Sequence, residues 1–429
     1  MKRALLTCSI FVLLAACNPS GNDRDQTLLF WSSNNAGEIA FSEERAAAWN
    51  NNNPSTTLQY QPVPEGQSSE EIILAAVVGK TTPDIYANMW QGSVEFYANA
   101  GVLVPLDTLE GFQDYITSRC NALTLAEITS ADGHIYQIPW KINPILTIYN
   151  KNIFRELGLD TLPVTYSQYL FAAEAFKKDL DHDGFADQWF GNTSVKTVWY
   201  QRLFNFYPLY LAASGGMPLI SGNKAAFNNT YAIEVFRFLQ TLYRENYFSK
   251  ERLSAGQDPF ISGKVATKFT GPWEISHLEK YKPEGFEYDY YSMLVPNGHQ
   301  GPVYTYGDPK SIVLFNTCRD PQTAFEYIRT LTDISGDLKL MEQTKQLPRR
   351  KGLDTLSAYR DFFTANPRLK IFARQADWIR GTDNSPVITE VLEILSQEYE
   401  ACVLYQKKTP EEAIADAERA VNVLLRVKE

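Results

Sequence analysis

The sequence has few of the side chains that metal and thiol chemistry require. Its 429 residues include four histidines and five cysteines, with no His-Glu-x-x-His and no Cys-x-x-Cys spacing. The Gly-x-Ser-x-Gly turn of serine hydrolases and the glycine-rich loops that hold phosphates are also missing. A glycosidase needs two facing carboxylates, and 50 acidic residues single out no particular pair. The motifs therefore give no positive support to an enzyme.

The chain also lacks a basic stripe. Its formal net charge is -10 and no run rich in lysine and arginine is present, which argues against a nucleic-acid partner. Hydrophobic residues make up 44% and charged residues 21%, as in an ordinary globular protein. Aromatic residues reach 13%, with 8 Trp and 24 Tyr. Many of them fill a core, but an excess of Trp and Tyr is also typical of clefts in which a sugar ring stacks on an aromatic face.

The first residues predict export. Lys2 and Arg3 precede an apolar stretch over residues 4–16, which is shorter than the roughly 20 residues of a membrane-spanning helix. The run Leu14-Ala-Ala-Cys17 resembles the bacterial lipobox, which implies that a diacylglyceryl group is attached to Cys17 and that palmitate-type acyl chains hold the protein at the membrane. We expect a signal peptide at 1–16 and a polar tether at 17–26. The alternative is an ordinary secretory signal with an incidental cysteine.

Three cysteines remain in the exported chain, Cys120, Cys318 and Cys402. An odd number at wide spacing is not a disulfide framework, even in a compartment that permits disulfides. One disulfide with one free thiol and three buried free thiols are both compatible with the sequence.

Apolar runs alternate with helical patterns along the chain, which indicates an α/β fold with largely parallel sheets. The length favours two lobes over a single core. We expect strands near 27–31, 57–61, 83–87, 145–149, 265–270 and 311–315, and helices near 38–49, 70–78, 166–179, 231–247 and 321–331. A last helix is predicted to begin after Thr409, because Pro410 suits its first position and Glu412 completes a capping box.

The order of these elements resembles the extracellular solute-binding proteins of ABC importers, in the branch with the maltose-binding and glycerol-3-phosphate-binding proteins. The resemblance covers nearly the whole exported chain. It is carried by Trp49-Asn50 with Asn53-Pro54, Gly79 with Pro83-Asp84-Ile85, Ile138-Pro139-Trp140 with Tyr149-Asn150-Lys151, Phe154, Gly158 and Pro163, Phe260-x-x-Gly263-Lys264-x-Ala266 with Gly271-Pro272-Trp273, and Lys407–Ala413.

The resemblance implies two α/β lobes, each a mostly parallel sheet flanked by helices, with a ligand cleft at the hinge. Lobe 1 is expected at 26–140 plus 300–347 and lobe 2 at 141–299 plus 348–429. The crossings between them are expected near 140–144, 295–300 and 347–352. It also implies a monomer that passes its solute to the transmembrane subunits of a permease, outside the cytoplasm and, in a Gram-negative cell, in the periplasm.

Ligand contacts are expected in loops beyond the carboxyl ends of the strands. Trp273 is the strongest expectation, because it matches the position at which maltose-type members stack a sugar ring. Arg380 resembles an arginine that contacts phosphate in the glycerol-phosphate branch, with an offset of one residue; a surface salt bridge is the alternative. The full set of expected contacts is Trp31, Ser33, Asn34, Glu65, Gln67, Asn88, Trp90, Gln91, Trp140, Thr270, Gly271, Trp273, Tyr306, Gly307, Asp308 and Arg380.

The sequence is compatible with two hypotheses about the chemical class of the solute. Stacking tryptophans favour a sugar or an oligosaccharide, and they also suit a choline-type cation. The regions 149–151 and 407–413 resemble the binders of glycerol-3-phosphate and of glycerophosphodiesters such as glycerophosphocholine. However, Trp90 stands where that branch carries a glutamate. We therefore expect carbohydrate, with a glycerophosphodiester as the alternative; an adhesin lipoprotein would be a third class and would need no hinged cleft.

One acidic loop has the spacing of a calcium site. Asp179, Asp181, Asp183 and Asp187 surround Gly184 as in an EF-hand loop, but Phe190 takes the place of its final bidentate glutamate. A solvated turn is the favoured interpretation and a structural calcium ion is the alternative. No other cofactor is expected.

Overall fold

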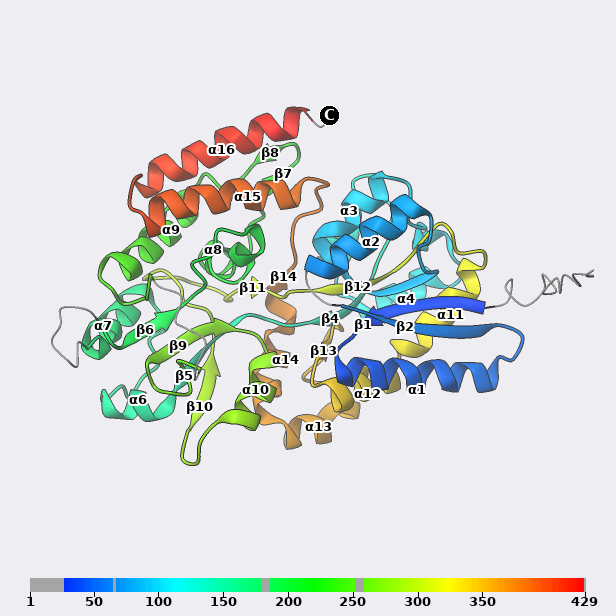
Figure 1. Ribbon diagram of the computed structural model, residues 1–429, viewed down its shortest axis with the longest axis horizontal. Helices are drawn as coiled ribbons and strands as arrows, with labels where there is room; N and C mark the ends of the chain where they lie inside the picture. The colour runs from blue at the N-terminus through cyan, green and yellow to red at the C-terminus, as the bar shows by residue number, and fades with distance from the viewer. Residues whose placement is uncertain (1–26, 65–66, 179–185, 251–257, 428–429) are drawn as a thin grey trace, which may run out of the picture.

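The computed structural model describes residues 27–64, 67–178, 186–250 and 258–427. These residues form two α/β lobes side by side, as expected from the sequence, and the chain passes between them more than once (Figure 1). No helix within the described ranges has both the length and the apolar character needed to span a membrane. Cys17 and the predicted signal peptide lie outside these residues, and so does most of the predicted calcium loop.

Lobe 1 is built on a six-stranded sheet with the order β13-β4-β12-β3-β1-β2. All six side chains of the central strand β3 are buried, because helices cover both faces of the sheet. Its strands are β1 (Thr27–Ser33), β2 (Thr57–Val63), β3 (Ile85–Trp90), β4 (Ile138–Ile142), β12 (Lys310–Leu314) and β13 (Leu347–Pro348). Its helices are α1 (Ala36–Asn52), α2 (Gln67–Gly79), α3 (Gln91–Asn99), α4 (Phe112–Arg119), α5 (Ala122–Ile128), α11 (Pro321–Leu331) and α12 (Ile334–Thr344).

Lobe 2 has a four-stranded sheet with the order β10-β5-β9-β6. Its strands are β5 (Leu146–Asn150), β6 (Trp189–Asn192), β9 (Val265–Thr270) and β10 (Tyr288–Tyr291). Around it lie α6 (Lys151–Glu156), α7 (Tyr166–Phe176), a 3-10 helix (Trp199–Leu203), α8 (Phe206–Ser214), α9 (Thr230–Arg244), α10 (Trp273–Tyr281), α13 (Arg360–Ala365), α14 (Pro367–Gln375), α15 (Ile388–Tyr399) and α16 (Pro410–Val427). Two short two-stranded sheets pair β7 (Ile220–Ser221) with β8 (Lys224–Ala225) and β11 (Thr305–Tyr306) with β14 (Ile379–Arg380).

The direction of the strands differs from the mostly parallel sheets that the sequence predicted. In lobe 1 only the pairs β1–β2 and β1–β3 are parallel, whereas β12 runs antiparallel to both of its neighbours. Among the described strands of the lobe 2 sheet, β6 and β9 pair in parallel and the other neighbours are antiparallel. The prediction failed because it applied the local βαβ pattern to strands that enter their sheet from the other lobe. A crossing between lobes does not require such a strand to run parallel to its neighbours.

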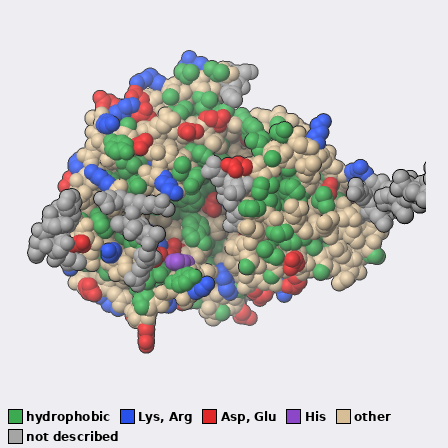
Figure 2. Space-filling model, in the orientation of Figure 1, with side chains coloured by type: hydrophobic (Ala, Val, Ile, Leu, Met, Phe, Trp, Pro, Cys, Tyr) green, Lys and Arg blue, Asp and Glu red, His purple; other side chains and the backbone are tan. Residues whose placement is uncertain are grey.

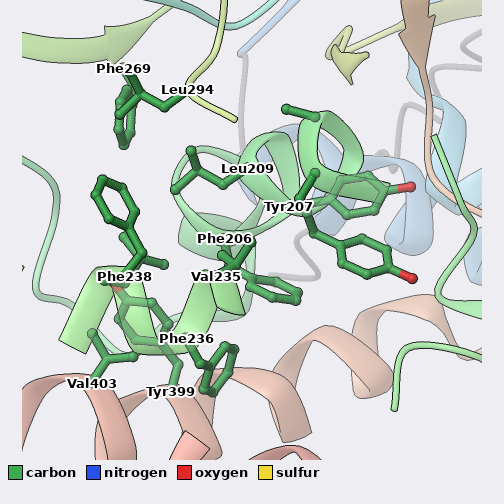
Figure 3. Close-up of a cluster of buried hydrophobic side chains, with 14 of the residues drawn as sticks. Phe206, Tyr207, Leu209, Val235, Phe236, Phe238, Phe269, Leu294, Tyr399 and Val403 are labelled. Carbon is green, nitrogen blue, oxygen red and sulfur yellow. The ribbon is translucent and has the colours of Figure 1, made fainter. Parts of the chain in front are cut away.

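The core of lobe 2 is unusually aromatic. Figure 3 shows Phe206 of α8, Phe236 of α9 and Tyr399 of α15 close together, and the Phe236 ring centroid lies 5.2 Å from that of Phe206 and 5.9 Å from that of Tyr399. The rings of Tyr166 and Phe238 stack with their centroids 4.1 Å apart and their planes 6° apart.

The helix α16 begins with the predicted capping box, since the Thr409 hydroxyl accepts the Glu412 N–H over 3.2 Å and the Glu412 carboxylate accepts the Thr409 N–H over 2.9 Å.

The crossings between the lobes lie side by side. The Asn143 N–H donates to the Gly307 carbonyl over 2.7 Å, and the Arg349 N–H donates to the Trp140 carbonyl over 2.8 Å. The three backbone segments therefore form one hydrogen-bonded hinge region, in which the short β11–β14 sheet also lies (Figure 1).

All three remaining cysteines are buried free thiols, the second of the two arrangements that the sequence allowed. Cys402 packs in the lobe 2 core, whereas Cys120 and Cys318 belong to the lobe 1 core. Burial raises the pKa of the Cys402 thiol to about 12, so the thiol stays protonated and acts as a small apolar side chain.

Candidate ligand cleft

Two adjoining cavities lie between the lobes, and Figure 2 shows the surface hollowed there with hydrophobic side chains in the hollow. The first, the polar compartment, has a volume of about 270 Å³. The second, the aromatic compartment, has a volume of about 380 Å³. The polar compartment is lined by Asn35, Asn88, Lys141, Asn143, Pro272, Trp273, Ser276, Asp308, Lys310, Thr344, Lys345 and Gln346. The aromatic compartment is lined by Ser69, Glu70, Asn88, Trp90, Trp199, Tyr200, Leu203, Phe204, Asp308 and Lys310.

Three polar side chains line both compartments, so the two cavities form one cleft. Asn88 comes from β3, and Asp308 and Lys310 come from the segment that enters the lobe 1 sheet as β12. Asp308 has a φ of 38°, in the left-handed region that aspartate tolerates better than most residues. Its carboxylate lies 3.2 Å from the Lys310 ammonium. The Asn88 side-chain oxygen is buried without a hydrogen-bond partner in the described structure, which leaves it available to a ligand donor.

A chain of aromatic rings forms one wall of the cleft. The Trp90 ring lies 5.0 Å from the Trp199 ring at an interplanar angle of 40°, and its indole N–H donates to the Tyr306 hydroxyl over 2.9 Å. Phe204 meets Trp273 edge-on at 6.0 Å and Tyr306 at 6.1 Å. Burial holds the pKa of Tyr306 well above its ordinary value, so its hydroxyl stays protonated and can donate to Asp308 over 3.4 Å. The wall therefore joins both lobes.

Glu70 adds a carboxylate to the aromatic compartment. It lies in the first turn of α2 and is partly buried. The Ser93 hydroxyl donates to its Oε2 over 2.7 Å and so fixes the orientation of the group. Burial raises the pKa of Glu70, while the Ser93 hydrogen bond and the Lys310 charge act in the opposite direction.

The polar compartment is cationic at its base. The Lys141 ammonium contacts the buried Glu38 carboxylate, and the Gln346 amide donates to the same Glu38 oxygen over 2.5 Å. The other Glu38 oxygen is buried without a hydrogen-bond partner among the described residues. Lys345, at the end of α12, lines the same cavity. The compartment thus carries more ammonium groups than carboxylates.

Trp273 covers one side of the polar compartment and is 45% exposed. It is the first residue of α10, directly after β9 and the Gly271-Pro272 turn. A Cβ atom at Gly271 would lie 2.1 Å from the Trp273 ring, so only glycine at that position leaves room for the indole. The sequence Thr270-Gly-Pro-Trp273 therefore positions a large aromatic face at the mouth of the cleft.

The structure brings four of the residues expected from the sequence to the cleft lining, namely Asn88, Trp90, Trp273 and Asp308. Tyr306 and Gly271 lie directly behind them, under Trp90 and Trp273 respectively. Asn88 and Trp90 are part of β3 rather than of the loop after it, because the strand extends to Trp90. The side chains of Glu65 and Gln67 lie outside the described residues.

Other expected residues lie elsewhere. Trp140 is fully buried in the lobe 1 core, since β4 extends to Ile142 and directs this indole away from the hinge. Trp31 and Ser33 belong to β1, which is longer than predicted, and Trp31 packs against the lobe 1 core. Asn34 is exposed and does not line either compartment. The buried Thr270 hydroxyl donates to Glu274 over 3.2 Å.

Gln91 and Arg380 contribute to an ionic network behind the cleft, and Gly307 belongs to the adjacent hinge. The Arg349 guanidinium donates to Gln91 over 2.8 Å and to Glu127 over 2.9 Å, with all three side chains buried. Arg380 lies 4.0 Å from Glu127. Glu127 also accepts the Gly381 N–H, while the Gly381 carbonyl accepts the Tyr207 hydroxyl over 2.9 Å. One residue of the hinge, Gly381, is therefore held by both lobes.

Sequence reasoning missed Trp199, Phe204, Glu70 and Lys310. The cluster Trp199-Tyr200 followed by Leu203-Phe204 was the available signal, because it places aromatic residues one helical turn apart. Glu70 and Lys310 gave no local signal, since their relevance depends on which strands and helices meet at the cleft.

One group of side chains outside the cleft has the composition of a metal site. Ligand atoms of Asp258, Glu274 and His277 lie within 4.8 Å of one another. However, the Lys268 ammonium lies 2.7 Å from Glu274 and 3.5 Å from Asp258. The Lys268 ammonium already pairs with both carboxylates, so the arrangement is an ion-pair cluster of lobe 2.

The protein has two lobes, a hydrogen-bonded hinge that joins them, and an aromatic and polar cleft between them. These features define a protein that binds a small molecule. The family model of bacterial extracellular solute-binding proteins matches residues 44–371, and the chain belongs to this family. Family and fold are those of solute-binding proteins rather than enzymes, and the family is described as extracellular.

Individual relatives agree with this assignment. The sn-glycerol-3-phosphate-binding periplasmic protein UgpB of Brucella abortus is 25% identical over 427 residues, covering 91% of this chain and 95% of its own. An uncharacterized Listeria monocytogenes protein superposes with a TM-score of 0.81 at 25% identity, over 93% of this chain and 100% of its own. The cyclic alpha-maltosyl-1,6-maltose binding protein of Arthrobacter globiformis has a TM-score of 0.77 at 21% identity, over 93% and 99%.

Proposed function

We propose that this protein captures a sugar or an oligosaccharide in its interlobe cleft and delivers it to the transmembrane subunits of an ABC importer. The observation that carries the proposal is the aromatic wall of Trp273, Phe204, Trp90 and Trp199 beside polar groups at the junction of the two compartments. Pyranose rings have apolar faces that stack on aromatic rings and hydroxyl edges that need hydrogen-bond partners.

The polar groups at the junction suit hydroxyls. Asn88 offers an unpaired acceptor, and Asp308 and Lys310 offer an acceptor and a donor whose charges balance each other. Hydrogen bonds between charged groups and neutral hydroxyls are stronger than those between two neutral groups. The two compartments, about 270 Å³ and about 380 Å³, leave room for more than one ring.

The ligands of similar solved structures support a carbohydrate. The Arthrobacter globiformis protein binds cyclic alpha-maltosyl-1,6-maltose, and a Listeria monocytogenes substrate-binding protein, 17% identical with a TM-score of 0.73, was solved with cycloalternan. At such identities the likeness concerns the fold, and the choice of ligand rests on the aromatic wall.

Delivery requires the lobes to open and close. The hinge crossings are tied by a few backbone hydrogen bonds, such as Asn143 to Gly307 and Ile145 to Tyr306, and a few dihedral angles there can change without breaking either core. Binding stabilises the closed population. We propose that Cys17 carries the lipid anchor and that the mature protein acts as a monomer with no catalytic activity.

A second candidate is glycerol-3-phosphate or a glycerophosphodiester. The UgpB relatives favour it, and so do the ammonium groups of Lys141, Lys310 and Lys345 in the polar compartment. Against it, Lys141 and Lys310 already contact carboxylates, and Arg380 does not line either compartment. A phosphate is best held by arginine or by several unpaired donors.

Mass spectrometry of the small molecule that co-purifies with the protein tests both candidates. Calorimetry with maltotriose, glycerol-3-phosphate and glycerophosphocholine follows, with a hydrolysis assay on the sugar. Sugar binding without turnover supports the proposal, and phosphate-ester binding alone replaces it with the second candidate. Turnover identifies an enzyme. X-ray scattering should show a smaller radius of gyration with the bound ligand; an unchanged radius contradicts lobe closure.

A further inference from the structure

The aromatic compartment contains a carboxylate, that of Glu70, which forms no ion pair among the described residues. Glu70 shares this cavity with Lys310, but the Lys310 ammonium is paired with Asp308 at 3.2 Å. Among the described residues, no lysine or arginine forms an ion pair with Glu70. Its one hydrogen bond from a side chain comes from the Ser93 hydroxyl to Oε2, at 2.7 Å.

The charges of this compartment sum to an excess of one negative charge. Glu70 and Asp308 are acidic and Lys310 is basic, whereas the other lining residues are neutral. Burial of a carboxylate beside apolar rings disfavours its charged form, and accordingly the pKa of Glu70 is raised. A positive group placed next to Glu70 would remove this penalty.

The rings around Glu70 are of the kind that bind cations. Trp90, Trp199, Tyr200 and Phe204 line the same cavity, and the planes of the two indoles are tilted by 40° with centroids 5.0 Å apart. Cations are attracted to the faces of aromatic rings, most strongly to tryptophan, and the attraction grows as water is excluded. Aromatic faces with one carboxylate satisfy an ammonium group better than a neutral hydroxyl.

We infer that the aromatic compartment receives a positively charged ammonium group of the solute, bound by the Glu70 carboxylate and the faces of Trp90 and Trp199. This inference rests on the part of the proposed function that places a small solute in the cleft, and it narrows the class of that solute. An ammonium group has two chemical sources here. It is either the protonated amine of an amino sugar or the quaternary ammonium of a choline-type group.

Two matched pairs of probes test the inference on the full-length protein by tryptophan fluorescence and calorimetry. Glucosamine is compared with glucose, and choline with its neutral isostere 3,3-dimethyl-1-butanol. We expect the cation of at least one pair to bind about tenfold more tightly than its neutral partner. The pair that shows the preference identifies the source of the ammonium group.

The variant Glu70→Gln keeps the shape and the hydrogen bond from Ser93 but removes the charge, and it should abolish the preference. The control is Glu71→Gln, which makes the same change at the exposed neighbour on α2 and should retain the preference. If thermal melting shows that Glu70→Gln is unfolded, Ser93→Ala takes its place and should weaken cation binding by releasing the carboxylate.

Equal binding within both pairs overturns the inference, and so does a preference that survives in Glu70→Gln. The same measurements give a different result if the proposed function is wrong. If neutral maltotriose binds wild type and Glu70→Gln equally and no cation preference exists, the sugar proposal stands and the Glu70 inference is wrong. If no sugar binds but choline is preferred over its isostere, the Glu70 inference stands and the sugar proposal is wrong.

Discussion

The indole N–H of Trp90 donates a hydrogen bond to the hydroxyl of Tyr306 over 2.9 Å, and both side chains are buried. Trp90 ends the lobe 1 strand β3, whereas Tyr306 lies in the hinge sheet and packs against Tyr207 of α8 in lobe 2, with ring centroids 5.7 Å apart. This pair therefore connects the aromatic wall of the cleft to the hinge.

Removing the hydroxyl should weaken both the fold and the cleft. In Tyr306→Phe the Trp90 N–H loses its buried partner, at an expected cost of about 1–3 kcal/mol in the free energy of unfolding. Urea denaturation measures this change. Tyr281→Phe, at an exposed ring of α10, is the control and should change stability by less than about 0.5 kcal/mol. Equal stability of Tyr306→Phe and wild type would show that water replaces the hydroxyl.

Truncation of Trp273 should affect binding more than stability. Its ring is 45% exposed, so Trp273→Ala removes a stacking face from the polar compartment while the core stays packed. We expect the affinity for the co-purified ligand to fall at least tenfold, a stacking contribution of about 1.4 kcal/mol or more. Calorimetry measures it, with Trp378→Ala as a control at another half-exposed indole. An unchanged affinity would remove Trp273 from the site.

The buried ion pair behind the cleft should be costly to break. Arg349→Met leaves the buried Glu127 carboxylate with only the more distant guanidinium of Arg380, at 4.0 Å, and we expect a loss of about 3–5 kcal/mol in the free energy of unfolding. The double variant Arg349→Met with Glu127→Gln should recover part of this loss, because the buried carboxylate charge is then removed. Arg237→Met, in an exposed pair with Glu411, should cost less than about 1 kcal/mol. A small loss for Arg349→Met would mean that water reaches Glu127.

Asp383 should make stability depend on pH. Burial raises its pKa to about 6, although it accepts the N–H groups of Leu219 and Ile220. A folded pKa above the unfolded value near 3.8 means that folding favours the protonated form. The stabilisation is therefore present below pH 4 and is lost as pH rises through 6, by about 2–3 kcal/mol in the free energy of unfolding.

The variant Asp383→Asn keeps an oxygen acceptor for both N–H groups but cannot ionise. Its free energy of unfolding, measured by urea titration between pH 4 and pH 7, should fall less than that of wild type. Asp160→Asn at an exposed position is the control and should follow wild type. If Asp383→Asn and wild type have the same slope, Asp383 is not the titrating group.

Structural elements that depend only on neighbouring residues in the sequence were predictable. The Thr409–Glu412 capping box sets the start of α16, and the strand over 265–270 is observed at the predicted residues, because these features depend on neighbours in sequence. Boundaries set by sheet partners were less predictable: β1 and β3 extend further than expected at their carboxyl ends, and Ser33, Asn88 and Trp90 therefore belong to strands.

By itself, the sequence determined the two-lobed α/β class, the family and the aromatic character of the cleft, because each is expressed in local patterns and in the order of motifs. Only the tertiary structure decided which of the aromatic residues face the cleft. It buries Trp140 and brings Trp199, Phe204 and Glu70 beside Trp90, although these residues are far apart in the chain. The physical reason is that strands and helices from distant segments pair at the hinge, and side-chain position at such a junction depends on partners that no local pattern specifies.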